Sequence, residues 1–364
     1  MARTAFDPAL LIDRAVGCGD WMVANQVTDR FDANRGRGIR SYDARTGESV
    51  LTGNWMTGTM LMSLPALAKR TGIDAYRDAA AWGLAWLGTE TGERLHLDRA
   101  RLFANRLIDR GRYRGWPLCA IYMDDSPDNF YSRGCFQSGA GPFFYDLFRF
   151  TGEAKYIERG LPPIASIYRD DFILENGRLV QERDPFTNRV TAPKPDETGL
   201  PVHALNDDFG SEMLLAAFRL FEDPSYPEAA GRYARWVASV QEPDNGCEGG
   251  RAPSAAPVSE MYLRDIGEEI GDAALVEASG RSLAKLIDMQ CQETGNPRID
   301  GGFQGIYEGE EADRWGRTCV NLRASCYALM ALINADSDLE DVWLGAHNRP
   351  FTDHRWRGLH DLIW

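Results

Sequence analysis

The sequence predicts an all-α protein whose helical hairpins close into a ring, or toroid. Three features support this class. Apolar helices alternate with amphipathic ones along the chain, a turn containing Gly or Pro together with Asp separates the two, and the first helix of each pair is apolar on nearly every side. Such a helix must be buried all round. A ring of five to seven hairpins, with the apolar helices inside the amphipathic ones, meets this need.

Length, composition and charge set further limits. The chain has 364 residues, of which 44% are hydrophobic and 26% charged, as in ordinary globular proteins. The hairpin rhythm favours one domain over residues 1–364. A net charge of −14 argues against binding the nucleic acid backbone. Because apolar runs fall short of the roughly 18 residues of a membrane span, we expect no membrane partner. Homo-oligomerisation is left open.

The hairpins follow one another in order. The opening helix, residues 7–26, has no partner next to it and should pair with a later inner helix. The repeats occupy residues 55–87, 134–168, 204–241 and 258–290, and a fifth inner element covers 320–333. Aspartate in the turns can cap the helix that follows.

Outer helices share a recurring ending. Two of them end alike, at Trp21–Gln26 and Trp236–Gln241, and Leu286–Gln290 is a looser third copy.

Two stretches break the hairpin period, 96–133 and 171–202. The second contains Asn176-Gly177, Asp184-Pro185 and two further prolines, which are turn and breaker signals. It predicts a small β excursion or a long loop over one mouth of the ring, with low strand content elsewhere.

The cysteines and histidines predict neither a disulfide framework nor a metal centre. The seven cysteines contain no Cys-x-x-Cys pair, so we expect reduced, mostly buried side chains. The five histidines contain no His-Glu-x-x-His, and the three in the C-terminal tail favour a solvated segment over a metal site. We expect no metal and no cofactor.

Several segments resemble a known group of enzymes. These are Gly53–Gly58, with the sequence Gly-Asn-Trp-Met-Thr-Gly, the Thr-Gly-x-x-x-Tyr hinges at 71–76 and 151–156, and His203–Glu212. They resemble the glycan-active (α/α)6-barrel enzymes, the six-hairpin glycosidase-like group, especially unsaturated glucuronyl and rhamnogalacturonyl hydrolases and related β-glucuronidases. The resemblance implies an (α/α)6 fold, an oligosaccharide substrate, and an aspartate as general acid/base at the start of an inner helix.

Asp207 and Asp208 lie just before the inner helix expected to begin near Phe209. A toroid presents the N-terminal ends of its inner helices to one mouth, so carboxylates there project into the cavity. A carboxyl group crowded by another and lined by aromatic rings has the raised pKa that a proton donor needs. The alternative is an N-cap aspartate with a solvated neighbour.

A second acidic group, Asp124-Asp125-Ser-Pro-Asp128, precedes another inner helix. Asp125 is our candidate for a second catalytic carboxylate from a neighbouring hairpin. Read as Asp-Asp-x-x-Asp, the same residues can chelate magnesium for a diphosphate substrate, although Pro127 interrupts any helix there. A polar turn that caps the next helix is the remaining alternative.

Substrate-binding candidates come from aromatic and basic side chains. Aromatic rings can stack on the apolar face of a pyranose, although most rings at helical spacing form core, and the candidates are Trp55, Trp116, Tyr131, Tyr262 and Trp315. Guanidinium groups bind carboxylates bidentately, although ordinary surface charge is the alternative, and the candidates are Arg37 within Asn34–Arg40, then Arg133, Arg317 and Arg323. His203 can bind substrate hydroxyls or act as a lyase base, with a structural role as the alternative.

Three activities therefore compete. The leading hypothesis is a metal-free glycoside hydrolase that acts on uronic-acid-containing oligosaccharides through Asp207 or Asp208. The second is a polysaccharide lyase that eliminates across a uronate, using Tyr131, His203, Tyr262 and Arg317. The third is a magnesium-dependent terpenoid cyclase, in which the acids at 124–128 chelate magnesium for a diphosphate substrate. Separately, Gly301–Gly305 is similar to the repeat of squalene cyclases.

The N-terminus favours an intracellular location for this enzyme. It lacks the apolar core and small-residue cleavage site of a signal peptide, so we expect a cytoplasmic enzyme that finishes imported oligosaccharides.

Overall fold

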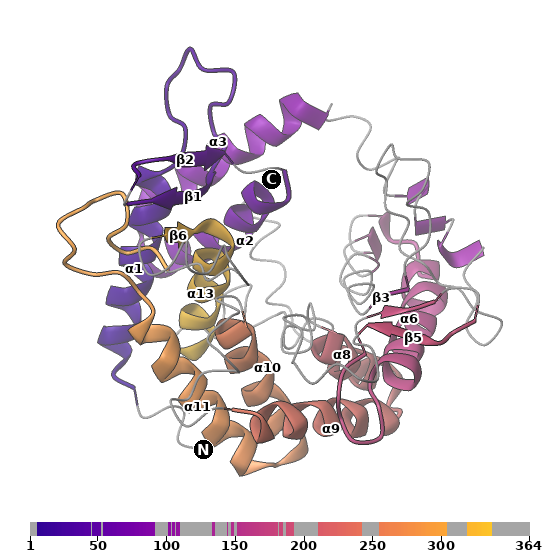
Figure 1. Cartoon of the computed structure of the whole chain (residues 1–364). Helices are drawn as coiled ribbons and strands as arrows, with labels where there is room; N and C mark the ends of the chain where they lie inside the picture. The colour runs from indigo at the N-terminus through magenta and orange to yellow at the C-terminus, as the bar shows by residue number, and fades with distance from the viewer. Residues whose placement is uncertain are drawn as a thin grey trace.

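The computed structural model describes the ring helices and part of their connections. It covers residues 6–44, 46–51, 54–91, 101–102, 104–105, 107–109, 133–134, 144, 147–148, 151–180, 182–184, 187–192, 210–241, 255–303 and 319–336. These residues are mostly helical and lie in two concentric layers around one axis, which Figure 1 views nearly end-on. The predicted all-α toroid of helical hairpins is confirmed.

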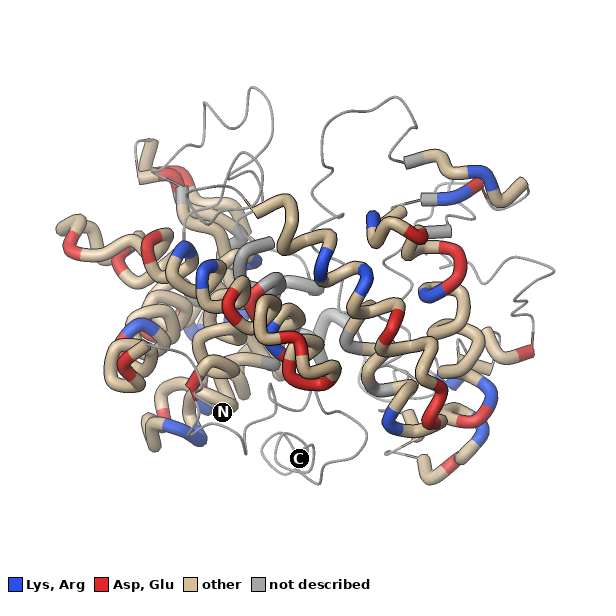
Figure 2. Tube along the Cα trace, turned by 90° about the horizontal axis from the view of Figure 1, so that it is seen from below, with Lys and Arg blue, Asp and Glu red and all other residues tan. Residues whose placement is uncertain are grey.

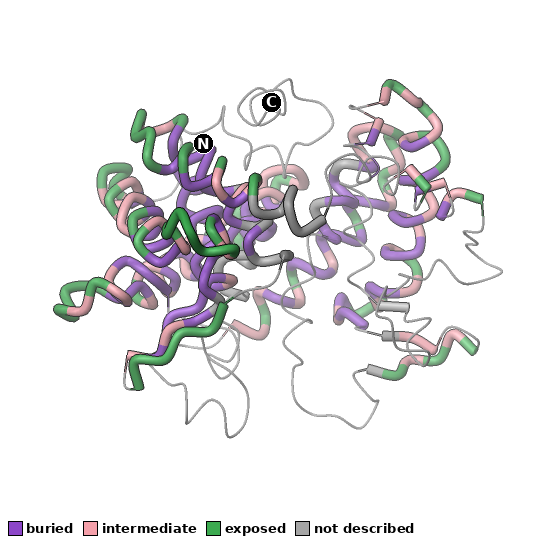
Figure 3. The backbone as a smooth tube through the Cα atoms, turned by 90° about the horizontal axis from the view of Figure 1, so that it is seen from above, coloured by how far each residue is buried: buried purple, intermediate pink, exposed green. Residues whose placement is uncertain are grey.

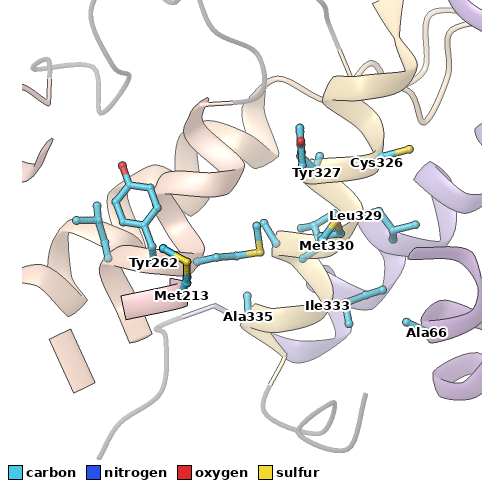
Figure 4. Packing of buried hydrophobic residues seen from close by; sticks show 14 of the residues in the cluster. Ala66, Met213, Tyr262, Cys326, Tyr327, Leu329, Met330, Ile333 and Ala335 are labelled. Carbon is cyan, nitrogen blue, oxygen red and sulfur yellow. The ribbon is translucent and has the colours of Figure 1, made fainter. Parts of the chain in front are cut away.

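The inner layer contains α2 (Asn54–Thr71), α8 (Gly210–Phe221), α10 (Ala255–Ile270) and α13 (Leu322–Ala335). Around the ring, α8 packs on α10, α10 on α13 and α13 on α2. In α13 every residue except Arg323 and Asn334 is buried. Figure 4 shows α13 between the helices that carry Tyr262 and Ala66. The helices that are apolar on nearly every side thus form the inner wall.

The outer layer contains α1 (Pro8–Ala24), α3 (Asp74–Thr91), α9 (Ser225–Ser239) and α11 (Ala273–Asp288). Each of α3, α9 and α11 follows its inner partner after a short turn. In the last of these turns Asp272 caps α11 by accepting a hydrogen bond from the Ala274 amide. Exposed residues gather at the outer edge, and buried ones face inward (Figure 3).

A composite helix completes the described outer layer. It runs through η2 (Tyr156–Gly160), α6 (Leu161–Ile167) and η3 (Tyr168–Phe172), of which the first and last are π-helical. Pro162 and Pro163 lack amide hydrogens and interrupt the i→i−4 pattern, which accounts for the irregular turn η2 before them.

The opening helix closes the ring. As the sequence predicted, α1 pairs with a late inner helix, namely α13. The Cys18 thiol donates to the carbonyl of Ser325 across 3.3 Å. Cys18, Cys291 and Cys326 are buried and not joined in disulfides, as expected for reduced cysteines. Burial, and then the neighbouring Cys326, raise the pKa of the Cys18 thiol well above its ordinary value.

The repeated glutamine endings tie successive outer helices together. Gln26, after α1, donates to the carbonyl of Ala79 in α3 at 2.9 Å, and Gln241, after α9, donates to that of Ala278 in α11 at 3.0 Å. Gln290, after α11, donates to the carbonyl of Arg14 in α1 at 2.8 Å. The three side chains therefore link α9, α11, α1 and α3 in ring order.

Glycines in the loops after outer helices allow a second close contact. Gly36, Gly177 and Gly301 all have φ between 84° and 94°. A Cβ atom on any of them would stand within 2.0–2.2 Å of a backbone carbonyl oxygen in the next outer helix. Only glycine fits both the left-handed conformation and this approach.

Two small antiparallel sheets accompany the helices. β1 (Ile39–Asp43) pairs with β2 (Ser49–Leu51) and with β6 (Cys319–Asn321). This sheet was not predicted, and the 320–333 element begins as strand. The second sheet joins β3 (Arg133–Gly134), β4 (Glu182–Arg183) and β5 (Val190–Ala192), so the β excursion expected near 171–202 is confirmed.

None of the helices in the described part of the chain is both long and apolar enough to cross a membrane. Lys and Arg are interspersed with Asp and Glu along the described tube (Figure 2).

The surroundings of three glycines predict how replacing each of them by alanine changes the free energy of unfolding. Gly301→Ala should destabilise the fold by about 3 kcal/mol or more, because it adds a clash with the Gly17 carbonyl to an unfavourable φ. Gly295→Ala shares the positive φ but meets open space, so it should cost only about 1–2 kcal/mol. Gly280→Ala, in open space within α11, should stabilise by about 0.5–1 kcal/mol. Urea unfolding measures all three, and equal costs at 301 and 295 would refute the close approach.

Replacing Gln290 tests the outer ties. Gln290→Ala removes the donor to two carbonyls, those of Arg14 and Gly301, and should cost about 2 kcal/mol of unfolding free energy. Gln290→Glu should cost more above about pH 5, where a carboxylate would face those carbonyl oxygens, and less as protonation restores a donor. The exposed Asp288→Ala, at the end of α11, is the control and should change stability by less than about 0.5 kcal/mol. A pH-independent cost for Gln290→Glu would contradict this role.

Candidate active site

The inner helices run in one direction, so their N-terminal ends open on one mouth of the ring. Interactions near the C-terminal ends of neighbouring helices establish this direction. These join Arg219 with Glu269, Arg264 with the carbonyl of Asn334, and Arg70 with Asp336. Because the C-terminal ends of α8, α10, α13 and α2 lie together, their N-terminal ends lie together at the opposite side.

Two of the inner helices are preceded by strands, which therefore lie at this mouth. β6 continues directly into α13, and β2 ends three residues before α2 begins. β1 pairs with both strands, which holds the starts of the two helices at the same end. Asp43, at the end of β1, is only 2% exposed and lies opposite Cys319. It is a buried carboxylate at the mouth that sequence reasoning did not select.

The start of α8 fixes where the acidic segment enters. Gly210, its first residue, packs so tightly on Tyr168 of η3 that a Cβ would stand 2.0 Å from the ring. Asp207 and Asp208 lie three and two residues before Gly210. Their side chains lie outside the described residues, but the chain that carries them reaches α8 at the mouth.

Three predicted binding residues have described side chains: Tyr262, Arg37 and Arg323. The Tyr262 ring is 1% exposed and packs against Tyr233 of α9, with ring centroids 5.4 Å apart, so it presents no face to a sugar. Arg37 lies at the mouth, because the amide of its neighbour Gly38 donates to Thr57 in the first turn of α2 at 3.4 Å. The Arg37 guanidinium donates to Asn34 at 2.9 Å.

The structure places the other candidates only in part. Trp55 is the second residue of α2, and Arg133 begins β3. The remaining predicted site residues lie outside the described part of the chain: Asp125, His203, Asp207, Asp208, Trp116, Tyr131, Trp315 and Arg317.

The inner faces of α13 and α10 can be assigned from their neighbours. In α13, Ser325 faces α1, and Cys326 and Tyr327 point to different sides (Figure 4). Helical spacing then places Arg323 and Tyr327, at i and i+4, on the face turned toward the axis. The Arg323 guanidinium carbon lies 5.7 Å from the centre of the Tyr327 ring.

In α10, Tyr262 faces α9 and Gly267 packs on Leu275 of α11. The same reasoning places Met261 and Asp265, at i and i+4, on the inner face.

A buried ion pair sits at the seam between α10 and α13. Glu260 is fully buried and pairs with Arg264, whose side chain is 8% exposed. The Arg264 guanidinium also donates to the Asn334 carbonyl at 2.9 Å. Sequence reasoning missed both residues, although a Glu and an Arg four positions apart in a helix otherwise expected to be buried was an available signal.

The described residues offer carboxylates and guanidinium groups at the mouth. Among them, no group of three or more His, Cys, Asp or Glu could hold a metal ion.

Comparisons with known proteins identify the fold. No protein-family model matches the sequence, and no curated protein matches it either. The structure is similar to the unsaturated glucuronyl hydrolase of Bacillus sp. GL1, with a TM-score of 0.66 at 17% identity over 90% of this chain and 97% of that one. It is also similar to a heparin-specific unsaturated glucuronyl hydrolase, at 0.66 and 14% over 93% and 100%.

A hydrolase of another specificity shares the fold. The α-1,6-mannanase of Salegentibacter sp. HEL1_6 is similar at a TM-score of 0.59 and 13% identity, over 91% of this chain and 100% of that one. The chain therefore has the (α/α) toroid fold of these solved structures, as the sequence resemblance predicted.

Breaking the buried pair should be costly. Glu260→Gln leaves Arg264 charged in the core and should lower the free energy of unfolding by about 3–5 kcal/mol. The matched control is Glu277→Gln in α11, whose pair with Arg281 has the same i,i+4 spacing but is exposed, and should cost about 0–0.5 kcal/mol. Chemical denaturation measures both, and similar costs would show that the Glu260 pair is not buried in solution.

Proposed function

We propose that this protein is a glycoside hydrolase that acts on uronic-acid-containing oligosaccharides, with residues 1–364 forming one catalytic (α/α) barrel. The observation behind this proposal is the entry of the Asp207–Asp208 segment into α8 at the mouth where the inner helices begin. Carboxylates at that position suit protonation of a glycosidic oxygen. We assign Asp207 or Asp208 as proton donor and Asp125 as the second carboxylate.

The solved neighbours support carboxylate chemistry on this fold. One is a glucuronyl hydrolase variant with a single Asp-to-Asn change, solved with an unsaturated glucuronyl tetrasaccharide. Another is a mannanase variant, called inactive, in which two consecutive aspartates are replaced. This chain contains three Asp-Asp pairs, at 124–125, 170–171 and 207–208.

The position of Asp170–Asp171 argues against this pair as the catalytic carboxylates and so favours the other two pairs for that role. It lies on η3, in the outer layer, and Asp170 is bound by Arg169. Burial, followed by the charges of Asp171 and Asp223, raises the pKa of Asp170. A raised pKa on a helix of the outer layer does not by itself identify a proton donor, and we therefore favour the other two pairs.

The chemistry depends on the form of the uronide. For a saturated uronide, the donor protonates the leaving oxygen while a second carboxylate activates water. A separation of about 6.5–9.5 Å between the carboxyl groups implies inversion, and about 5–5.5 Å implies retention. For an unsaturated uronide, one acid protonates the vinyl ether and water adds to it. Trp55, Trp116, Tyr131 and Trp315 are the proposed sugar platforms, with His203, Arg133, Arg317 and Arg37 as polar contacts.

A neutral substrate is the second candidate, because the mannanase shares the fold. Unsaturated and saturated glucuronyl oligosaccharides and α-1,6-manno-oligosaccharides should be incubated with the protein and analysed by mass spectrometry. We expect a gain of one water on the uronides. Cleavage without water, with a new absorbing double bond, would indicate a lyase and overturn the hydrolase assignment.

Single substitutions test the proton donor. Asp207→Asn or Asp208→Asn, whichever removes the donor, should lower kcat on the uronide by about 10²–10⁴-fold with the unfolding midpoint unchanged. Asp170→Asn, from the outer Asp-Asp pair, is the matched control and should keep kcat within about twofold. Full turnover in both Asp207→Asn and Asp208→Asn would exclude this pair from catalysis.

A further inference from the structure

We propose that Phe31 and Arg30 form a secondary binding site, the rim site, for a sugar unit of a long acidic substrate. This inference rests on the proposed glycoside hydrolase function and extends it to substrate units beyond the reacting one. It starts from the exposure of Phe31. Its side chain is 82% exposed, more than any other large apolar side chain in the described part of the chain, so its burial contributes almost nothing to folding.

The loop that carries Phe31 is held by hydrogen bonds within its turns. The Asp29 carboxylate accepts from the Phe31 amide at 2.9 Å, and the Asp32 carboxylate accepts from a backbone amide two residues later at 2.8 Å. At the base of the loop, the Gly36 amide donates to the Val27 carbonyl at 2.7 Å. Because the loop is already ordered, a ligand that covers the ring loses little binding free energy to ordering it.

Both ends of this loop lie at the mouth of the ring. The loop follows α1, and Cys18 in the C-terminal half of α1 bonds to Ser325 in the first turn of α13. After the loop, the Gly38 amide donates to Thr57 in the first turn of α2 at 3.4 Å. The loop therefore leaves and rejoins the ring beside the starts of inner helices, where substrate enters under the proposed function.

One face of the Phe31 ring is covered, and the exposure of the side chain leaves the other face open. The Arg30 guanidinium carbon lies 4.5 Å from the ring centre, within the range of a cation–π contact. The open face can accept the apolar face of a pyranose. Among the described residues, no carboxylate lies within ion-pair distance of Arg30, so its donors can bind the carboxylate of an adjoining uronate unit.

The charges of the loop favour an acidic sugar chain over a neutral one. Residues 27–37 contain three arginines and two aspartates, within a chain whose net charge is −14. Both aspartates are used as acceptors of backbone amides. Arg35 stacks on Trp82 of α3 at 5.0 Å, and Arg37 donates to a neighbouring side chain of the loop. Arg30 is therefore the arginine of this loop that lies beside the exposed ring.

The first test compares a short substrate with a long one. Wild type, Phe31→Ala and Arg30→Met should be assayed on an unsaturated glucuronyl disaccharide and on a decasaccharide of the same repeat. For Phe31→Ala we expect KM on the decasaccharide to rise about 5–20-fold, with kcat and the disaccharide kinetics within about twofold. Arg30→Met should raise KM on the decasaccharide about 3–10-fold. Leu102→Ala, which removes another side chain that is 67% exposed, is the matched control and should change neither substrate.

The second test measures binding without turnover. The same proteins should be run by native electrophoresis in gels that contain hyaluronan, a polymer with alternating glucuronate units, or a neutral α-1,6-mannan. We expect hyaluronan to retard the wild type and the Leu102→Ala variant more than Phe31→Ala or Arg30→Met. Because the Phe31 and Arg30 side chains are exposed, neither change should move the unfolding midpoint.

The outcomes separate the rim site from the proposed function. Equal retardation of wild type and Phe31→Ala would overturn the rim site and leave the hydrolase assignment standing. Retardation by the mannan as strong as that by hyaluronan would overturn its acidic preference. A wild-type dimer that dissociates in Phe31→Ala, seen by size-exclusion chromatography, would assign the ring to a contact between copies and overturn the proposal. Retardation that depends on Phe31, in a protein that cleaves no glycan, would support the rim site and overturn the hydrolase assignment.

Discussion

Closure of the ring between its first and last helices is the constraint on which the other features depend. α13 is buried on almost every side, so it needs neighbours in both layers, and α1 supplies the outer one. The contact is secured from two directions. Cys18 bonds to Ser325 within the pair, and Gln290 and Gly301 bring the end of α11 against α1. Without this return, the apolar face of α13 that α1 covers would be exposed to water, at a cost of roughly 25 cal/mol per Å² of apolar surface.

The fold could be predicted from the sequence because the spacing of apolar residues in each hairpin indicates which of its helix faces are buried. The apolar inner helices, the Gly-Asp turn before α11 and the opening helix that returns to a later partner were all predicted, and the shared Gln26 and Gln241 endings proved to be ring ties. The β1–β2–β6 sheet was missed because β1 pairs with residues some 280 positions away, and such pairing leaves no local period. Its local hairpin signal, Ile39–Asp43 against Ser49–Leu51 around Gly47, was available, but no element was predicted there.

The candidate site could be predicted from the sequence only where the helices that carry it could be predicted. Sequence placed Asp207 and Asp208 at the start of an inner helix, and the structure places that start at Gly210, beside Tyr168. Tyr262 shows why residue type and helical spacing do not identify a sugar-binding ring. Its type and spacing suit a sugar platform equally well as a core position, and only the approach of Tyr233 from α9 decides for the core. Periodicity identifies the buried stripe of a helix, but the partner that covers it is set by tertiary packing.

Shared architecture with both glucuronyl hydrolases and a mannanase implies that specificity resides where the ring leaves side chains unconstrained. In the later turns of the inner helices, side chains form ion pairs between neighbouring elements, such as Arg219–Glu269 and Arg70–Asp336. The outer faces of these helices pack in the hydrophobic core. First turns and the strands that precede them meet fewer such demands. The proposed carboxylates, Asp207 and Asp208, precede such a first turn. The ties that stabilise the ring and the proposed site therefore lie at opposite ends of the same helices.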